Sequence, residues 1–441
     1  MKTINVGICG LGTVGSGVVN VMQRNVAAIA ARAGREVSIT HIGARRDNPA
    51  CDVGSAKVSR DIFAVVNDPN VDIVIELIGG YEPALELVMQ AIANGKHVVT
   101  ANKALIAMHG NEIFAAAEKQ GVSVLFEAAV AGGIPIIKAM REGLAANSIE
   151  WLAGIINGTG NYILTEMRDK GRQFNDVLAD AQQLGYAEAD PTFDVEGIDA
   201  AHKLVILASL AFAMPLNFDA CFTEGISAVA PQDVVFAGEL GYRIKHLGIA
   251  RKTEQGVEMR VHPTLIPQRR LIANVDGVMN AVLVKGDAVG PTLYYGPGAG
   301  AEPTASSVIA DIVDVVRTID AQPTSRVPAL GVVQKSLSAL PVLSISDINT
   351  AYYLRINVSD QPGVLSHITQ ALSDSGISIE AVLQKEAVQH EANRDLSSRQ
   401  VPIVLITDRT LESQFMAAVE RIEALDAVQE SIHFIRVESL G

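Results

Sequence analysis

The sequence predicts an α/β protein with three units: a Rossmann-type doubly wound parallel sheet, an α+β domain, and a ferredoxin-like unit. Over the first 130 residues, short apolar strands alternate with helical stretches, which is typical of right-handed βαβ units around a parallel sheet. Residues 351–441 follow the order βαββαβ, which is the order of the ferredoxin-like split unit. The composition between them changes to glycine- and proline-rich turns.

Residues 1–130 are predicted to form the nucleotide-binding unit. Apolar runs that read as its strands occupy residues 3–9, 36–44, 71–77, 97–100 and 122–126. Helical spacing of apolar residues predicts helices at residues 13–32 and 83–94, and a third helix before the last strand.

Residues 131–320 are predicted to form an α+β domain for substrate binding and dimerisation. After the turn AGGIP we expect a long helix, the loop NGTGNYIL, and a helix pair ending in the apolar run 204–212. Residues 258–295 are rich in strand patterns. A return helix at about 301–320 is expected to pack on the first unit, and residues 321–350 to form a linker.

The last unit should place its strands and helices in strict alternation. Strands are expected at residues 353–358, 379–385, 401–407 and 428–437. Helices are expected at residues 363–375 and in a stretch ending near residue 425. The polar stretch HEANRDLSSRQ, residues 390–400, is predicted to be the hairpin loop between the middle strands.

Composition excludes several classes of function. The 441 residues carry a net charge of −14, whereas nucleic-acid binding and docking on anionic lipid both need basic surface. Three widely spaced cysteines without a CxxC pair predict neither a disulfide framework nor a zinc site. The N-terminus does not resemble a signal peptide, and no apolar stretch is long enough to span a bilayer. We therefore expect a soluble cytoplasmic protein.

The strongest local motif is a glycine-rich turn between the first strand and the first helix. It has the GxGxxG spacing of a dinucleotide fingerprint. Its residues are Gly10, Leu11, Gly12, Thr13, Val14 and Gly15. The first glycine permits the tight turn, the second lets a pyrophosphate approach, and the third lets helix and strand pack closely. The alternative is a structural glycine turn without a ligand.

The end of the second strand bears on the choice of cofactor. An acid there usually binds the ribose hydroxyls of NAD, and arginine often binds the 2′-phosphate of NADP. Here Arg45 and Arg46 precede Asp47. The arginines favour NADP(H), while Asp47 keeps NAD(H) as the alternative, and both arginines can also be ordinary solvated residues.

Asp199 and Lys203 lie four residues apart on one predicted helical face. Their simplest interpretation is an ordinary helix ion pair. However, Lys203 leads into an apolar run that must be buried, and desolvation favours a neutral lysine suited to proton transfer. Glu188, Asp190 and Asp194 precede the pair, and such a density of acids suits a substrate with an ammonium group.

Two further segments are candidates for binding. Lys103 follows a strand at its carboxyl end, where open α/β sheets bind ligands, although a surface lysine is the alternative. The apolar turn at residues 127–134 can be a simple connection or can hold a hard monovalent cation with its carbonyl groups. His202 and His109 have no partner at ligand spacing, and we interpret both as structural.

Eight ordered segments over residues 1–320 resemble the homoserine dehydrogenase family. They are GLGTVGSGV, VIELIGGYEPA, HVVTANKALIA, FEAAVAGGIPII, NGTGNYILTEM, LGYAEADPTFDVEGIDAAHKL, VHPTLIP and YYGPGAGAEPTAS. The C-terminal unit, with DQPGVL at residues 360–365, resembles an ACT domain. The arrangement is similar to the monofunctional bacterial enzyme.

The resemblance implies reduction of L-aspartate 4-semialdehyde to L-homoserine by NAD(P)H, in threonine, methionine and isoleucine biosynthesis. Lys203 matches the general acid, Asp199 the carboxylate that orients substrate and lysine, and Lys103 a catalytic lysine near cofactor and substrate. Glu188 matches a substrate-binding acid, and Asp194 of the same acidic segment is predicted to bind substrate too. Residues matching the family's cofactor contacts are Thr13, Val14, Arg45, Lys103, Gly185 and Gly300. Those matching its sodium site are Glu127, Val130, Gly132 and Ile134.

The resemblance also implies that the ACT unit binds an amino-acid effector, threonine. Main-chain amides near Gly363 and Val364 can take its carboxylate, and Asp360 its ammonium group. The alternative is a unit that only joins subunits. A homo-oligomer, dimer or tetramer, is expected. Rival functions are a dehydrogenase of the same fold for another amino aldehyde, and a catalytically silent sensor of nucleotide or amino acid.

Overall fold

The computed structural model describes residues 2–385 and 400–441. Among these residues, six parallel strands form the first sheet in the order β3-β2-β1-β4-β5-β6. Their bounds are β1 Ile4–Cys9, β2 Val37–Gly43, β3 Lys57–Ser59, β4 Ile73–Glu76, β5 His97–Thr100 and β6 Val124–Leu125. The strand order reverses between β1 and β4, which confirms the doubly wound Rossmann-type sheet and fixes its ligand crevice there.

Helices cover both faces of this sheet. One face packs on α1 (Thr13–Arg24), α2 (Val26–Ala33) and α12 (Ala301–Thr318). The other packs on α3 (Phe63–Val66), α4 (Ala84–Ala93) and α5 (Lys103–Gln120). The single helix expected at residues 13–32 is wrong in one respect, because the chain leaves helical geometry at Asn25, which ends α1 and precedes α2.

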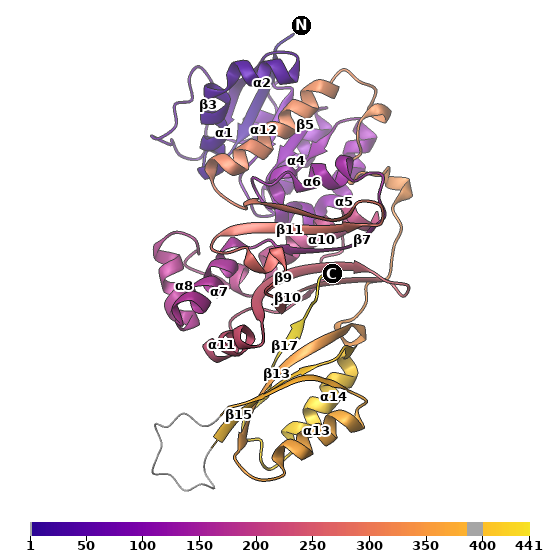
Figure 1. Ribbon diagram of the computed structural model, residues 1–441. Helices are drawn as coiled ribbons and strands as arrows, with labels where there is room; N and C mark the ends of the chain where they lie inside the picture. Colours follow the sequence, from indigo (N-terminus) through magenta and orange to yellow (C-terminus); the bar gives the residue numbers. More distant parts are fainter. Residues whose placement is uncertain (1, 386–399) are drawn as a thin grey trace.

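Helix α12 returns from the second unit and lies beside α1 (Figure 1). The contact is close because α1 has a glycine there: a Cβ on Gly17 would lie 2.4 Å from the carbonyl oxygen of Ala301. Arg24 and Glu302 add an ion pair at 2.8 Å. The first residues of α12 are thereby fixed near the nucleotide-binding turn that begins α1.

The second unit is built on an antiparallel sheet in the order β12-β11-β7-β9-β10. Its strands are β7 Ile149–Ile155, β9 Tyr242–Lys252, β10 Val257–Pro267, β11 Met279–Gly286 and β12 Gly290–Pro297, with β8 Phe222–Thr223 beside β10. Its main helices are α7 Gly158–Lys170, α8 Phe174–Gln183, α9 Thr192–Val195, α10 Ile198–Phe212 and α11 Pro231–Glu239. Helix α10 is almost entirely buried between this sheet and α5.

Two expectations for the second unit are wrong. The long helix after AGGIP is only the short α6 (Ile136–Lys138) and a π-helical turn (Ala139–Gly143), and residues 149–155 form β7 instead. The expected loop NGTGNYIL is the start of α7. Asn157 caps that helix, since its Oδ1 accepts from the Gly160 amide at 2.7 Å, so two glycines after a good cap begin a helix rather than prevent one.

The third unit has the ferredoxin-like strand order β17-β13-β15-β14. Its elements are β13 Asn349–Ser359, α13 Val364–Asp374, β14 Ile379–Gln384, β15 Gln400–Thr407, β16 Thr410–Leu411, α14 Glu412–Glu423 and β17 His433–Val437. Helices α13 and α14 pack on one face around Tyr352 and Phe415. The polar stretch expected as a hairpin loop, residues 390–400, lies outside the described residues except for Gln400, which begins β15.

The third unit is joined to the second through its sheet. Strand β17 pairs in parallel with β10, so that the two sheets are continuous (Figure 1). The face of the ACT-like sheet opposite its own helices packs on α7 and α11, with Tyr353 and Val404 against Leu164 and Phe236 in one buried cluster. The C-terminal unit is therefore docked on the second unit over a whole sheet face.

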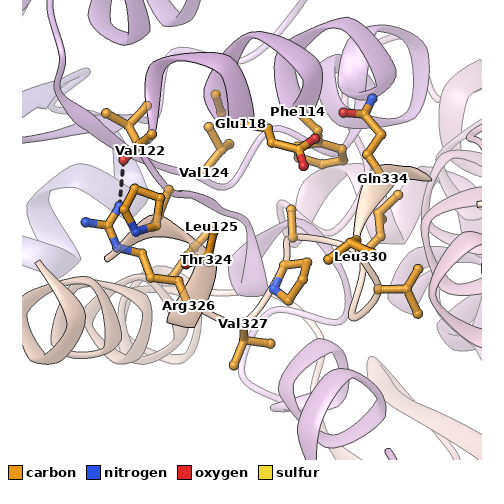
Figure 2. A pocket seen from close by; sticks show the side chains of 18 of the residues that line it. Phe114, Glu118, Val122, Val124, Leu125, Thr324, Arg326, Val327, Leu330 and Gln334 are labelled. Carbon is orange, nitrogen blue, oxygen red and sulfur yellow. Dashed lines mark hydrogen bonds between the residues drawn. The ribbon is translucent and has the colours of Figure 1, made fainter. Parts of the chain in front are cut away.

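The stretch expected as a linker is also packed against the protein. Arg326 donates to main-chain carbonyls, among them that of Gly121 at 2.7 Å, and the Val257 amide donates to Pro341 O at 2.9 Å. Between this stretch, α5 and β6 lies a cavity of about 390 Å³. Figure 2 shows side chains of both parts, including Phe114 and Leu330, lining it.

Over the described ranges, no helix combines the length and the apolar character that crossing a membrane requires.

Candidate active site

The glycine-rich turn has the geometry that a dinucleotide fingerprint needs. Gly10 has φ +109°, and a Cβ there would lie 2.6 Å from Leu77 O. A Cβ on Gly15 would lie 2.1 Å from Gly10 O. A Cβ on Gly12 would meet no protein atom within 4 Å, so the turn is open on the side that a phosphate would approach. Thr13 begins α1 and is exposed, as a helix N-terminus that receives an anion must be.

Leu11 and Val14 complete this turn. Leu11 is buried in the core cluster on the α1 side of the sheet, and Val14 packs partly against it. The Leu11 side chain therefore anchors the turn, and the Val14 side chain is partly covered.

A third arginine, Arg60, lies at the end of β2 in addition to Arg45 and Arg46. Arg45 and Arg46 are exposed after the strand. Asp47 makes an ion pair with Arg60 at 2.8 Å, and Arg60 also donates to Ala44 O at 3.2 Å. Sequence spacing could not reveal this pairing, because Arg60 comes from the segment after β3.

Lys103, Asp199 and Lys203 meet in one cluster. Asp199 Oδ1 lies 3.1 Å from Lys103 Nζ, and Asp199 Oδ2 lies 2.6 Å from Lys203 Nζ. The side chains of Asp199 and Lys203 are only 8% and 12% exposed, against 37% for Lys103. The ordinary helix ion pair between Asp199 and Lys203 exists, but it is buried and shared with a lysine of the first unit.

Two asparagines that the sequence did not single out hold this cluster. Asn157 donates from Nδ2 to Asp199 Oδ2 at 2.9 Å and to Asp194 Oδ1 at 2.8 Å. Asn102 caps α5 by accepting from the Leu105 amide at 3.1 Å, which places Lys103 at the first turn of that helix. Both are helix caps, and an asparagine at the start of a helix is the one sequence signal that could have indicated them.

The pKa shifts follow from burial and from the shared charges. Burial lowers the pKa of the Lys203 ammonium group, and Asp199 opposes that shift. The pKa of Lys103 is raised, chiefly by Asp199. Burial acts to raise the pKa of Asp199, but Lys203 and Lys103 outweigh it and hold that pKa below its usual range. The arrangement thus combines a permanent carboxylate with a lysine that gives up its proton more easily than usual.

The acids before α10 divide into two groups. Asp194 is half-buried and bonded to Asn157, and burial raises its pKa. Glu188 is exposed and close enough to Lys103 to raise the pKa of that lysine. Asp190 instead accepts hydrogen bonds from Thr192 in its own loop. Gly185, φ +74°, is exposed in the same segment.

Most of the candidate oxygen atoms in the turn at residues 127–134 already accept hydrogen bonds. The Glu127 carboxylate accepts from the Ile137 and Lys138 amides. Gly132 O accepts from Ser307 Oγ at 2.6 Å, and Ile134 O from the Ile136 amide at 2.8 Å. Each carbonyl oxygen keeps a second lone pair. Among described residues, no group of three His, Cys, Asp or Glu side chains is placed to hold a metal ion.

The remaining predicted residues lie at two helix starts. Gly300, φ +123°, precedes α12, and a Cβ on Gly132 would lie 2.4 Å from Gly298 O, so these two glycine turns touch. In the third unit Gly363, φ +93°, precedes α13, which begins at Val364, and Asp360 is exposed before it. Asp360 and Gly363 are exposed, whereas Val364 is buried in the core of the third unit.

Comparison with known proteins accounts for all three units. Residues 10–127 match the model of the homoserine dehydrogenase NAD-binding domain, residues 135–313 the homoserine dehydrogenase model, and residues 352–424 the ACT domain. Homoserine dehydrogenase of Pseudomonas aeruginosa is 62% identical over 441 residues, with 100% of both chains covered.

The chain belongs to the homoserine dehydrogenase family. The Neisseria gonorrhoeae homoserine dehydrogenase is 53% identical, again over 100% of both chains. The crystal structure of a Thiobacillus denitrificans homoserine dehydrogenase is 61% identical with a TM-score of 0.94, covering 100% of this chain and 99% of that one. A hyperthermophilic archaeal homoserine dehydrogenase in complex with NADPH is 25% identical, with a TM-score of 0.60, covering 71% of this chain and 97% of that one.

Membership in this dehydrogenase family identifies the chain as an oxidoreductase with a nicotinamide-cofactor-binding domain. The resemblance seen in the sequence is confirmed, as is the ACT domain. The open turn at Gly12 fits such a cofactor, because its pyrophosphate needs close approach to main-chain amides.

Proposed function

We propose that the chain reduces L-aspartate 4-semialdehyde to L-homoserine with a nicotinamide cofactor, preferring NADP(H). The observation that carries this proposal is the buried cluster of Lys103, Asp199 and Lys203. It joins a residue beside the nucleotide crevice to the catalytic helix α10. A reductase of an amino aldehyde needs a proton donor at that place.

The cofactor supplies a hydride to the aldehyde carbon when it is bound. Lys203 donates a proton to the aldehyde oxygen as negative charge develops there, so that the carbonyl becomes the alcohol. The lowered pKa of Lys203 eases this donation, and Asp199 and Ile156 O, at 2.6 and 2.7 Å from Nζ, aim the ammonium group. Glu188 and Asp194 attract the substrate ammonium group.

Lys103 is proposed to act at the boundary between cofactor and substrate. It starts α5 at the carboxyl end of β5 and reaches Asp199 across the units. Its raised pKa keeps it charged. A permanent cation at this position attracts the anionic oxygen that forms during reduction.

The preference for NADP(H) rests on charge at the end of β2. Arg45 and Arg46 are exposed after β2, and Arg60 pairs with the carboxylate of Asp47 that NAD would use. Positive charge of this kind supports binding of a 2′-phosphate. A family member bound to NADPH supports the same cofactor. NAD(H) remains the alternative to be measured.

Three further properties belong to the proposal. The ACT unit binds threonine near Asp360, Gly363 and Val364, and bound threonine inhibits the enzyme. The enzyme forms a homo-oligomer. Carbonyl groups of the turn 127–134 hold a sodium ion, a hard cation that prefers such oxygen donors. The location is the cytoplasm, where three free cysteines stay reduced.

The test is an initial-rate assay of NADPH and of NADH oxidation with L-aspartate 4-semialdehyde, with and without threonine. We expect turnover, a lower KM for NADPH than for NADH, and inhibition by threonine. Lys203→Met should bind NADPH normally and lose turnover. Nucleotide binding without turnover in the unaltered protein would contradict the reaction and favour another amino aldehyde or a silent sensor.

A further inference from the structure

Tyr81 reaches from the nucleotide-binding unit to the catalytic helix. It follows β4 in a loop that Glu76 fixes by accepting from the Ile78 and Gly79 amides at 2.8 and 3.1 Å. Asn102 Nδ2 donates to Gly80 O at 2.7 Å, which ties the same loop to the start of α5. The Tyr81 hydroxyl lies 3.4 Å from Nε2 of His202 on α10, and the residue is 39% exposed.

His202 is buried beside the lysine cluster. It directly precedes Lys203 and is one helical turn from Asp199. Its ring stacks on Phe218 at 4.4 Å and on Phe193 at 5.7 Å between centroids. Burial lowers its pKa to about 4, so the imidazole is neutral near pH 7 and carries one N–H group.

The surroundings of the two ring nitrogens decide which one carries that hydrogen. Nδ1 is buried and has no hydrogen-bond partner in the described structure. A buried N–H without an acceptor costs more than a buried lone pair, because orphaned N–H groups are the rarer case in proteins. The hydrogen therefore belongs on Nε2, which donates it to the Tyr81 hydroxyl oxygen. Since that oxygen accepts, the phenolic proton remains available to another group.

The order of strands in the first sheet indicates which half of the cofactor lies near the Tyr81 hydroxyl. The dinucleotide crevice lies between β1 and β4, where the strand order reverses. Its pyrophosphate turn is at Gly10–Gly15, and the adenosine half extends toward the arginines at the end of β2. The other half must then lie toward β4 and β5, where the Tyr81 loop and Lys103 are found.

We propose that Tyr81, oriented by the neutral imidazole of His202, binds the nicotinamide half of the cofactor and positions it against the Lys103–Asp199–Lys203 cluster. The contact of 3.4 Å is long for a hydrogen bond, and we expect it to shorten when the cofactor binds. His202 is here a positioning residue that acts through Tyr81. The inference rests on the nicotinamide-binding domain and is independent of which aldehyde is reduced.

The experiment compares the whole cofactor with a fragment. Tyr81→Phe removes only the hydroxyl and keeps the ring, which also packs edge-on against His109 with the ring centroids 6.0 Å apart. By calorimetry we expect Tyr81→Phe to raise the Kd of NADPH about fivefold, as loss of one hydrogen bond does. The Kd of 2′,5′-ADP, which lacks the nicotinamide half, should not change. Tyr295→Phe, an exposed tyrosine of β12, is the matched control.

His202 variants test the coupling. His202→Phe keeps the aromatic stack without the donor and should weaken NADPH binding in the same direction, whereas His202→Gln keeps a donor and should restore it. The double variant Tyr81→Phe/His202→Phe should bind no more weakly than Tyr81→Phe alone. Thermal melting of each variant shows that it is folded.

Two results would overturn the inference. Equal weakening of NADPH and 2′,5′-ADP would place Tyr81 outside the nicotinamide half. Multiplying effects in the double variant would make the two residues independent. A protein that binds NADPH through Tyr81 but does not reduce L-aspartate 4-semialdehyde would contradict the proposed reaction alone.

Discussion

Thr264 of β10 pairs with Arg436 of β17, and this register joins the sheet of the catalytic unit to that of the ACT domain. Charged side chains are buried along the junction. Glu438, just after β17, meets Arg251 at 2.9 Å and also Arg260, whose side chain is fully buried. Arg436 pairs with Glu412 and, at 2.7 Å, with Glu224 of the catalytic unit. The ACT domain is thus linked directly to β10 by strand pairing and buried ion pairs.

The first prediction concerns the stability of this junction. Glu438→Gln leaves Arg251 and Arg260 sharing the Glu258 carboxylate, at 3.5 and 3.1 Å, where two carboxylates faced them before. Weakening such a buried network costs up to about 3 kcal/mol. We expect a clearly lower midpoint of urea unfolding. Lys285→Met breaks an exposed ion pair with Glu150, 3.0 Å, and should cost less than about 1 kcal/mol. Equal midpoints for the two variants would show that the buried pairs of Glu438 add no more stability than an exposed ion pair.

The Glu438 carboxylate also predicts how the stability of the protein depends on pH. Burial acts to raise the pKa of Glu438, but Arg260 and Arg251 outweigh it and hold that pKa at about 2, below the ordinary 4.5. A carboxyl whose pKa is lowered by folding stabilises the fold above its unfolded pKa and loses that effect as the pH falls. The melting temperature of the unaltered protein should therefore drop from about pH 4.5 toward pH 2 more steeply than that of Glu438→Gln. Parallel melting curves would contradict this assignment.

A further prediction concerns Asp199. Asp199→Asn removes the anion that supports the protonated form of Lys203, so the pKa of Lys203 should fall further below its ordinary value. We expect kcat to fall about a hundredfold or more, and the loss of activity at alkaline pH to begin at a lower pH. Steady-state rates over a pH series measure both. Asp180→Asn, which removes an exposed partner of Arg172, is the control and should keep the original pH profile.

Structural features that depend on local residue spacing are predicted correctly from the sequence. The turn at Gly10–Gly15 and the pair Asp199–Lys203 follow from strand, helix and i, i+4 geometry, and both exist. The loop expected at residues 157–164 is wrong because Asn157 caps a helix there. The long helix expected before it is wrong because residues 149–155 form β7.

The sequence patterns do not predict contacts between distant segments. Nothing local indicates that Lys103 touches Asp199, that Arg60 pairs with Asp47, or that β17 extends the catalytic sheet. The prolines and polar residues of the expected linker likewise do not indicate that it packs against the protein. Such contacts are set by the packing of whole units, which a pattern along one chain does not encode.

Gly12 should separate cofactor binding from folding. A Cβ there meets no protein atom within 4 Å and its φ is −78°, so Gly12→Ala should fold normally. The added methyl group would occupy the space of the pyrophosphate, and the Kd of NADPH should rise about tenfold or more. Calorimetry and thermal melting measure the two properties. Gly238→Ala, an equally open glycine of α11, should change neither, and unchanged NADPH binding in Gly12→Ala would place the phosphates elsewhere.

The choice between cofactors should depend on Arg60, because Arg60 decides whether Asp47 is free. In the unaltered protein the ion pair of 2.8 Å occupies the Asp47 carboxylate and adds positive charge beside Arg45. Arg60→Ala removes one cation from the site proposed for the 2′-phosphate and releases the acid that can bind the ribose hydroxyls of NADH. We expect the KM for NADPH to rise and the KM for NADH to fall, measured as initial rates with each cofactor. Lys57→Ala, which removes an exposed charge from neighbouring β3, should leave the ratio unchanged. If Arg60→Ala also leaves it unchanged, the preference is set by Arg45 and Arg46 alone.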